Sequence, residues 1–300
     1  MTETCRYFDS EEWDERLERH VGRVWDVQDL VEEYKKDYRD IESITGKKTD
    51  HIFELDMSDV VAIWGETEPH GFDNVPENCP HDVRKDGLCI FHLSVEKKDD
   101  EEAKDELLKK IRQGGKENKE FVGARFGKLN LAYEVLESEA DNHHINLRFA
   151  QVNELDMSDT IVRQPWYISQ STMGNCHFHH TIFERNSNFT GAEFRERADF
   201  SDVNFRGTAD FGGTEFRDQS NFSDVKFRES SFSRAKFGGA ASFLGTEFRE
   251  QSNFNDAKFG TVTFISSEFG GVAEFDNAKF RGVAGFTGVE FGERASFKRA

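Results

Sequence analysis

The sequence predicts a mainly β protein whose C-terminal part, residues 176–300, is a β-solenoid, and two observations lead to this fold class. First, phenylalanine occurs 23 times from Phe178 to Phe297, always five or six residues after the previous one. Second, the residue two positions before each of these phenylalanines is always Ala, Ser, Thr, Val or Cys. Residues two apart lie on the same side of a strand, so each unit turns one small and one large side chain inward.

An α-helix does not fit this spacing. A step of five residues turns by about 140° around a helix, because each residue turns by about 100°. The phenylalanines would then form two separate lines instead of one packed seam. The 14 glycines between Thr181 and Ala300 also argue against a helix, because glycine is unfavourable in helix interiors. Very short strands joined by corners explain the pattern better.

Two units, Ala198-Asp199-Phe200 and Ala209-Asp210-Phe211, match the motif of the pentapeptide repeat family literally, and residues 176–300 resemble that family. The resemblance implies a right-handed quadrilateral parallel β-helix, with four units per coil and phenylalanines stacked inside. Nine of the 22 intervals contain six residues, and we expect the additional residue to bulge at a corner. The predicted structural core includes Phe194, Phe205, Phe216, Phe227, Phe248 and Phe259.

Taking every fourth unit as one face of this helix predicts two charged ladders on its outer surface. One ladder is Glu193, Glu215, Lys236, Lys258 and Lys279. The ladder on the opposite face is Asn204, Lys226, Glu247, Glu268 and Glu290. Charge changes sign along each ladder, which is typical of a solvated, mixed surface.

The remainder of the chain predicts a mixed, partly helical N-terminal capping domain. We place an acidic α-containing domain at residues 1–115, irregular capping coils at 116–175 and the regular β-helix at 176–300. Apolar residues at three- and four-residue steps predict a helix from Ser10 to Ile41, which docks on the chain or self-associates. Alternation predicts a strand at His51–Trp64. A second helix is predicted at Asp99–Gln113, because Asp99 can cap it and Gly114 can end it.

One cluster in the N-terminal part suggests a metal site. Cys79, His81, Cys89 and His92 supply the sulfur and nitrogen donors of tetrahedral zinc, and Cys89 and His92 have the spacing of a zinc knuckle. Cys5 or His70 could replace His81. The alternative interpretation is that reduced cysteines and histidines pack in a loop-rich subdomain. In Cys176-His177-Phe178-His179-His180, the register turns Cys176 inward and away from the histidines, which disfavours metal there. We predict structural zinc as the candidate cofactor.

Charge and hydropathy narrow the location and the partners. The net charge of −19 comes almost entirely from residues 1–170, because residues 171–300 hold 18 acidic and 16 basic residues. Such an acidic surface disfavours direct nucleic-acid binding, since phosphates are repelled. We see no signal peptide and no apolar run near the roughly 18–20 residues that cross a bilayer. With only four scattered cysteines, the expected location is the cytoplasm.

The sequence contains no defensible nucleophile–base pair, phosphate loop or paired carboxylates, so we predict a protein that is not an enzyme. The favoured function is a scaffold or protein–protein interaction module with a rigid solenoid surface and a protein partner. The first alternative is a topoisomerase inhibitor that mimics DNA, as some members of the resembled family do. The second is a zinc-dependent regulator or enzyme through the N-terminal domain. At the C-terminus, we expect a parent chain that continues beyond Ala300 or a homodimer through the last coil.

Overall fold

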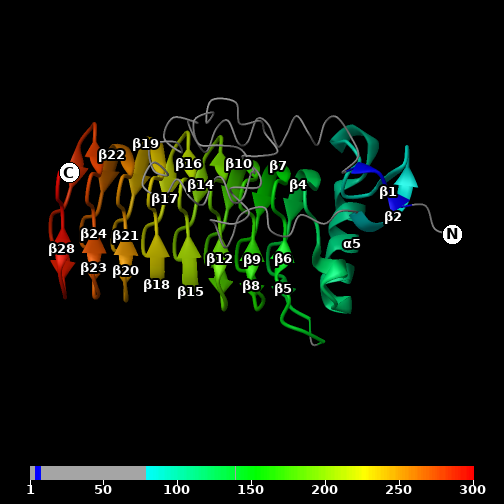
Figure 1. Cartoon of the computed structure of the whole chain (residues 1–300), viewed down its shortest axis with the longest axis horizontal. Coiled ribbons are helices and arrows are strands. Elements are labelled where there is room, and N and C mark those ends of the chain that lie inside the picture. Colours follow the sequence, from blue (N-terminus) through cyan, green and yellow to red (C-terminus); the bar gives the residue numbers. More distant parts are fainter. Residues whose placement is uncertain (1–3, 8–78, 139) are drawn as a thin grey trace, which may run out of the picture. The chain divides into compact units, whose positions relative to one another are not determined.

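The computed structural model describes residues 4–7, 79–138 and 140–300. The predicted helix at residues 10–41 and the predicted strand at residues 51–64 lie outside the described residues. In the part from residue 79 onward, a short hairpin and one α-helix precede a parallel solenoid of about seven turns (Figure 1). The fold class predicted from the sequence is therefore confirmed.

The described strands form three sheets. The first sheet contains β1 (Thr4–Cys5), β2 (Cys79–Lys85) and β3 (Leu88–Cys89). The second contains β4 (Arg125–Asn130), β7 (Gln151–Asp156), β10 (Thr172–His177), β13 (Glu193–Phe194), β14 (Ala198–Asp199), β16 (Glu215–Phe216), β17 (Ser220–Asn221), β19 (Lys236–Ser242), β22 (Lys258–Thr263), β25 (Lys279–Phe280) and β26 (Ala284–Gly285). The third contains β5 (Val135–Leu136), β6 (Ile145–Asn146), β8 (Ile161–Val162), β9 (Trp166–Tyr167), β11 (Ile182–Phe183), β12 (Ser187–Asn188), β15 (Asn204–Asp210), β18 (Lys226–Ser231), β20 (Glu247–Phe248), β21 (Ser252–Asn253), β23 (Glu268–Phe269), β24 (Ala273–Glu274), β27 (Glu290–Phe291) and β28 (Ala295–Ser296).

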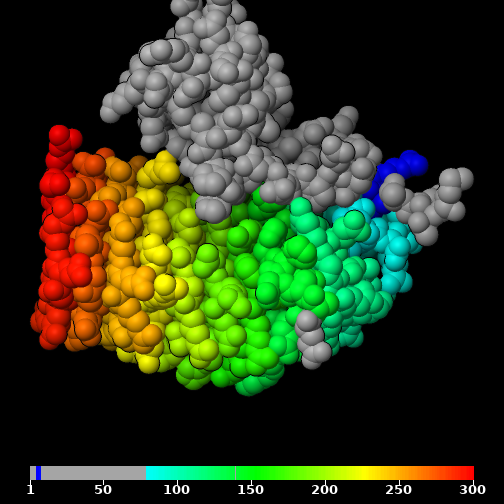
Figure 2. All heavy atoms as spheres, turned by 60° about the horizontal axis from the view of Figure 1, so that its bottom comes forward, coloured from blue at the N-terminus to red at the C-terminus, as the bar shows by residue number. Residues whose placement is uncertain are grey.

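Each phenylalanine from Phe178 to Phe275 lies beside the fourth phenylalanine further along the chain. The parallel register pairs Phe205 with Phe227 and Phe227 with Phe248. We name the four faces of the solenoid after these ladders: face A contains Phe200, face B Phe205, face C Phe211 and face D Phe216. The coils follow one another in sequence order as bands of colour in the space-filling view (Figure 2).

The four corners of a coil are of two kinds. The corners after faces A and C are tight turns, in which the second residue after the phenylalanine has a positive φ, as Asp202 and Gly213 do. The peptide nitrogen of Val203 donates to the carbonyl oxygen of Phe200 across one such turn. These two corners always give a five-residue interval, and every six-residue interval falls at a corner after face B or face D.

The corners after faces B and D are extended and accommodate either five- or six-residue intervals. Long strands such as β15 and β19 pass around them, and the register of each with its neighbour shifts there. In the pair of β15 with β18, the shift lies between Phe205 and Thr208. The additional residue is thus absorbed as a bulge, and the phenylalanine ladders stay aligned on both sides of it.

The outward residue before each tight turn explains the Asp and Asn of the repeat motif. The Oδ1 atoms of Asp199, Asn221 and Asn253 each accept a hydrogen bond from the peptide nitrogen two residues further along the chain. This is an Asx turn, which stabilises the tight corner from the strand side. Faces B and D have no such turn to cap, and apart from Ile182 and Asn204 on face B their outward positions carry long Glu and Lys side chains instead.

The core is a set of phenylalanine stacks. Phe205, Phe227 and Phe248 are at most 1 % exposed, and successive rings lie 5.1 and 5.2 Å apart in nearly parallel planes. The predicted core residues Phe194, Phe216 and Phe259 are also buried. In the last coil, however, Phe291 and Phe297 are 39 % and 42 % exposed, so the interpretation that every phenylalanine of the series is core needs correction. No further coil of the described chain covers these rings.

Helix α5 (Asp100–Gln113) packs against β4 and β5 at the N-terminal end of the solenoid. Asp99 caps it by accepting a hydrogen bond from the peptide nitrogen of Glu102. Its inner side buries Leu107 and Ile111. Two short 3-10 helices flank it, η3 (Val95–Lys97) and η4 (Glu117–Lys119). The helix predicted at these residues is confirmed.

The irregular coils after α5 belong to the same solenoid. Val152 pairs with Phe126 on one side and with Met173 on the other, on the face that later carries Phe194. The same ladder therefore continues with mixed apolar residues before phenylalanine becomes regular. No helix among the described residues is both long and apolar enough to span a membrane.

Candidate metal centre and interaction surface

The interior of the array, residues 176–300, leaves no room for a ligand. Rings on neighbouring faces meet edge to face, as Phe222 and Phe232 do at 5.4 Å. Burial also raises the pKa of the Cys176 thiol, which lies fully buried with the small inward residues. Functional side chains of the array must therefore lie on its outer surface or at its ends.

Four buried donors come together beside the hairpin of β2 and β3. The ligand atoms of Cys5, Cys79, Cys89 and His92 all lie within 4.8 Å of one another. The Sγ atoms of Cys5 and Cys89 lie 3.3 and 3.2 Å from Nδ1 of His92. None of the four residues is more than 4 % exposed. Such a set of sulfur and nitrogen donors is suited to a tetrahedral zinc ion.

The local chain geometry explains why these donors converge. Asp86 and Gly87 both have positive φ values and turn β2 back into β3. After β3 the chain makes a tight turn, in which the peptide nitrogens of His92 and Leu93 donate to the carbonyl oxygen of Cys89. Cys89 and His92 are thus presented from one turn, as their spacing predicts.

The structure replaces His81 by Cys5 in this cluster. His81 is buried, but its ring stacks on Phe121 and its Nε2 donates to the carbonyl oxygen of Glu120 at 2.8 Å. Burial lowers the pKa of His81 to about 4. Alternating residues of a strand point the same way, so Cys79 and His81 share one side of β2. The two residues are nevertheless separated along the strand, and only the side chain of Cys79 lies close to the other donors.

A second group of polar side chains is buried around the first coils. Lys119, which is fully buried, forms an ion pair with Asp141. Burial pushes the pKa of Asp141 up, but hydrogen bonds from Lys119 and from two peptide nitrogens outweigh it and bring it to about 2. Burial raises the pKa of Glu120, which accepts from Asn146. This network holds the cap together, and we define the cap as residues 4–7, 79–138 and 140–150.

His144 belongs to the same region and is not the solvated residue that its polar loop suggests. Its ring stacks on Tyr167 with 4.5 Å between ring centres. Burial lowers the pKa of His144 to about 4, assisted by the positive charge of Arg148. Nothing in the sequence of that loop indicates this stacking, because Tyr167 lies on the next coil.

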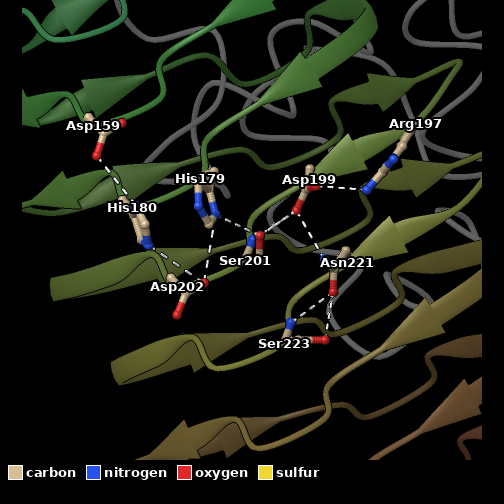
Figure 3. A network of polar contacts seen from close by, with 9 residues as sticks. All are labelled: Asp159, His179, His180, Arg197, Asp199, Ser201, Asp202, Asn221 and Ser223. Atoms are coloured by element: carbon tan, nitrogen blue, oxygen red, sulfur yellow. Dashed lines mark hydrogen bonds and ion pairs between the residues drawn. The ribbon is translucent and has the colours of Figure 1, made fainter.

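An exposed histidine pair lies at the tight corner after face A (Figure 3). His180 lies 3.3 Å from Asp159 and 3.8 Å from Asp202 in the neighbouring coils, measured between ring nitrogen and carboxylate oxygen. His179 lies 3.0 Å from the hydroxyl of Ser201. The side chains of the pair are about half exposed. His179, His180 and Asp202 therefore form a cluster with donors for a metal, but an open one.

Beside this pair, face A carries a short polar network (Figure 3). Asp199 accepts hydrogen bonds from Ser201 and Asn221. It also forms an ion pair with Arg197 at 2.8 Å. Partial burial pushes the pKa of Asp199 up, but these hydrogen bonds and the charge of Arg197 hold it below its ordinary value. The network is the continuation of the Asx turns, so its first role is structural.

Face A changes character toward the last coils. Three adjacent segments, residues 238–246, 260–267 and 282–289, contain no charged residue. We call them the neutral patch. Parallel pairing of β19 with β22 and of β22 with β26 places them side by side. Leu244, Ile265 and Val283 are exposed on it by 44 %, 38 % and 74 %. A groove of about 350 Å³ extends from the patch to the preceding coils, and its lining includes Ala240 and Thr261 of the patch together with Arg197 and Asn221.

The charged ladders flank this patch on the two adjacent faces. The register pairs Lys236 with Lys258 and Lys258 with Lys279 on face D. On face B it pairs Glu247 with Glu268 and Glu268 with Glu290. The two predicted ladders are therefore confirmed, and they border an uncharged surface that was not predicted from the sequence. The signal for it was the run of uncharged residues at 22-residue spacing.

Comparison with known proteins agrees with this architecture. Residues 189–234 and 222–267 match the sequence model of a family described as pentapeptide repeats, in nine copies. The regular array is thus a pentapeptide repeat solenoid. Residues 189–267 therefore consist of repeats of this family. The acidic N-terminal part with Cys89-Ile-Phe-His92 also resembles proteins from halophilic archaea, and this resemblance stays a prediction.

Two solved structures are similar to parts of this chain. The first is HetL from the cyanobacterium Nostoc sp. strain PCC 7120, a pentapeptide repeat protein involved in the regulation of heterocyst differentiation. It is 14 % identical, with a match that covers 62 % of this chain and 93 % of HetL and a TM-score of 0.20. The second is QnrB1, a plasmid-mediated fluoroquinolone resistance protein. It is 21 % identical, and the match covers 55 % of this chain and 91 % of QnrB1 with a TM-score of 0.18. The comparison with curated proteins gave no match.

Proposed function

We propose that this protein is a non-enzymatic scaffold that binds a protein partner through the neutral patch on face A. The observation that supports this function is the patch itself, an uncharged surface in a chain of which 32 % is charged. Apolar groups that are exposed together in this way are typical of protein–protein contacts. The filled interior supports the same conclusion, because it leaves the outer surface of the array to carry function.

The surroundings of the patch favour a protein partner with a flat apolar surface. Protein interfaces commonly have an apolar centre and a polar rim. Here the centre is formed by Leu244, Ile265 and Val283. The rim is formed by the lysine ladder of face D and the glutamate ladder of face B. A partner with charges complementary to both ladders would be held in one orientation.

Site-specific crosslinking tests this function. A photo-crosslinking residue at position 265, in extracts of the source organism, should capture a distinct protein. The same residue at position 253, on face C, should not capture it. Ile265→Arg should abolish capture from position 244, whereas the matched variant Ser231→Arg on face C should not. Equal capture from both faces, or capture that Ile265→Arg leaves unchanged, would reject the patch.

Inhibition of a topoisomerase by DNA mimicry is the first alternative, and it requires a long negative face. The glutamate ladder of face B is negative for three coils, but Lys226 precedes it. Face D carries three successive lysines. In residues 171–300, the acidic residues outnumber the basic residues by only two. We therefore rank this alternative second. Clear inhibition of gyrase supercoiling by stoichiometric amounts of the protein would reverse this order.

A zinc-dependent regulator or enzyme is the remaining alternative. Catalytic zinc keeps one coordination position open for water or substrate. The buried cluster offers four protein donors, which favours a closed structural site. The cytoplasmic location stays a prediction.

For the oligomeric state, we propose a homodimer through the last coil. Strands β27 and β28 each pair with one described neighbour only, β23 and β24. Phe291 and Phe297 are exposed beside these edges, and exposed strand edges favour pairing. Light scattering should give twice the chain mass, and Phe297→Glu should lower it. A monomer at micromolar concentration would contradict the dimer without affecting the neutral patch.

A further inference from the structure

The buried cysteine and histidine cluster supports an inference that is independent of the interaction surface. We propose that Cys5, Cys79, Cys89 and His92 bind one structural zinc ion. The ion would join three separate parts of the chain: β1, the first residue of β2, and the turn that follows β3.

The distances in the cluster match those of a zinc centre. In tetrahedral sites, zinc lies about 2.3 Å from sulfur and about 2.0–2.1 Å from nitrogen, so neighbouring donor atoms are about 3.5–3.8 Å apart. The Sγ atoms of Cys5 and Cys89 lie 3.3 and 3.2 Å from Nδ1 of His92. All four donors lie within 4.8 Å of one another. The two sulfur–nitrogen distances are a few tenths of an ångström shorter than in such a site, and shifts of at most about 1 Å would bring the remaining donors to its spacing.

The donor types favour zinc over other common ions. Three thiolates and one imidazole are soft or borderline ligands, whereas magnesium and calcium prefer oxygen. The donors are also closed off from solvent, since Cys89 is fully buried and Cys79 is 2 % exposed. Structural zinc sites have this combination of four protein ligands and no open position.

The surroundings of His92 prepare it to bind a metal through Nδ1. Its Nε2 atom lies 2.8 Å from the carbonyl oxygen of Val122. A carbonyl can only accept, so Nε2 carries the proton and Nδ1 turns its lone pair toward the sulfur atoms. Ligand histidines in zinc sites are commonly oriented by such a second hydrogen bond.

Two further contacts would stabilise the negative charge of the centre. The peptide nitrogen of Cys89 donates to Sγ of Cys5 at 3.3 Å, and hydrogen bonds to an ionised sulfur favour the thiolate. Nζ of Lys98 donates to the carbonyl oxygens of Ile90 and Phe91, inside the turn between Cys89 and His92. Three thiolates around a divalent ion leave an excess of negative charge, which this ammonium group would offset.

Metal analysis of the full-length protein tests the proposal directly. The protein is produced in zinc-supplemented medium, purified under reducing conditions and analysed by mass spectrometry for bound metals. We expect about one zinc per chain. Replacement by Co²⁺ should give the visible absorption of tetrahedral cobalt together with intense sulfur-to-cobalt charge transfer, which reports thiolate ligands independently of zinc content.

Variants distinguish this ligand set from its alternatives. Cys79→Ser and Cys89→Ser should each reduce the bound zinc at least tenfold. Cys176→Ser is the matched control, because it removes a buried thiol inside the solenoid and should leave the zinc content unchanged. His81→Asn should also leave the zinc in place, which separates this set from one that contains His81.

The decisive results do not depend on the ligand variants folding well. Retention of zinc in Cys89→Ser would overturn the assignment, as would loss of zinc in a His81→Asn protein that keeps the circular dichroism spectrum of the native chain. Absence of zinc from the native chain would overturn it as well, most clearly if mass analysis of non-reduced peptides found Cys5 and Cys79 in a disulfide. The cobalt spectrum of the native protein is the remaining check, since a spectrum without charge-transfer bands would exclude thiolate coordination.

Discussion

The array and the cap are stabilised in two different ways. In the array, each coil repeats the same phenylalanine stack and the same two tight turns, so its stability comes from many equivalent contacts between neighbours. In the cap, the apolar ladder continues with mixed residues, and single polar groups such as the buried Lys119 and the partly buried His144 add contacts of their own. The comparison teaches that a change in the array should have a graded effect set by burial. A change in the cap should depend on which partner it leaves behind.

The largest effect is expected at the centre of the array. Phe227→Ala removes a fully buried ring that stacks on Phe205 and Phe248. It should lower the free energy of unfolding by about 3–5 kcal/mol. Urea denaturation followed by circular dichroism measures it. In the last coil, Phe291→Ala should cost less than half as much, because that ring is 39 % exposed. Equal losses at both positions would contradict a graded array.

The next effect belongs to the cap. Lys119→Met leaves Asp141 without its ion pair and should lower the free energy of unfolding by about 2–4 kcal/mol, slightly less than a fully buried pair. The exposed pair of Lys128 and Glu154 provides the control, since Lys128→Met should have a much smaller effect in a pair that water screens. Adding Asp141→Asn to Lys119→Met should recover part of the loss. Failure to recover any of it would indicate a packing defect instead.

A pH dependence of intermediate size should come from His144. Its pKa is about 4 in the folded protein, whereas the ordinary value for histidine, which applies to the unfolded chain, is 6.5. The unfolded chain therefore binds the proton first as pH falls, and the stability that neutral His144 provides is lost between about pH 6.5 and 4. We expect a loss of about 2–3 kcal/mol over this window. Glu120, whose pKa is raised by burial, opposes part of it.

Denaturation at several pH values measures this effect by comparing the native protein with His144→Gln. The variant should show a shallower fall in stability between pH 6.5 and 4. Identical pH profiles would mean that His144 does not titrate in this window. Because Nε2 of His144 lies 3.9 Å from a carboxylate oxygen of Glu120, the double variant with Glu120→Gln separates the two contributions.

The smallest effect is expected at the exposed histidine pair. His180 is about half exposed, and its partners Asp159 and Asp202 lie on the surface. His180→Ala should change the free energy of unfolding by less than about 0.5 kcal/mol. Thermal denaturation with and without added Ni²⁺ checks the open cluster. If nickel stabilises the native protein but not His180→Ala, this corner binds metal in addition to its structural role.

Much of the array could be predicted, because one rule is repeated in every unit. The small residue before Phe205 and the polar residue between them define the inward and outward sides without any long-range information. Even the ladder from Lys236 to Lys279 followed from counting four units per coil. The distinction between two kinds of corner was also present in the spacing, since five-residue intervals always follow the units of faces A and C.

The cap could be predicted only where the signal is local. The helix at residues 100–113 has its own capping residue and its own end at Gly114. The proposed metal cluster includes Cys5, which the sequence offered only as an alternative to His81, because no spacing rule reports contacts between residues as far apart in the chain as Cys5 and Cys79. The burial of His144 is equally non-local, because it requires a ring from the following coil. The structure of the array could be predicted because its sequence repeats, whereas the cap has no such repeat and its long-range contacts could not be predicted.

The two kinds of corner have a consequence for how such a chain can change during evolution. A codon gained or lost at a corner after face B or face D would alter one bulge and leave every other coil in register. The same event at a corner after face A or face C would break a turn that requires a residue with positive φ, such as Asp224 or Gly245. Insertions and deletions in related sequences should therefore accumulate on two opposite edges of the solenoid and be rare on the other two.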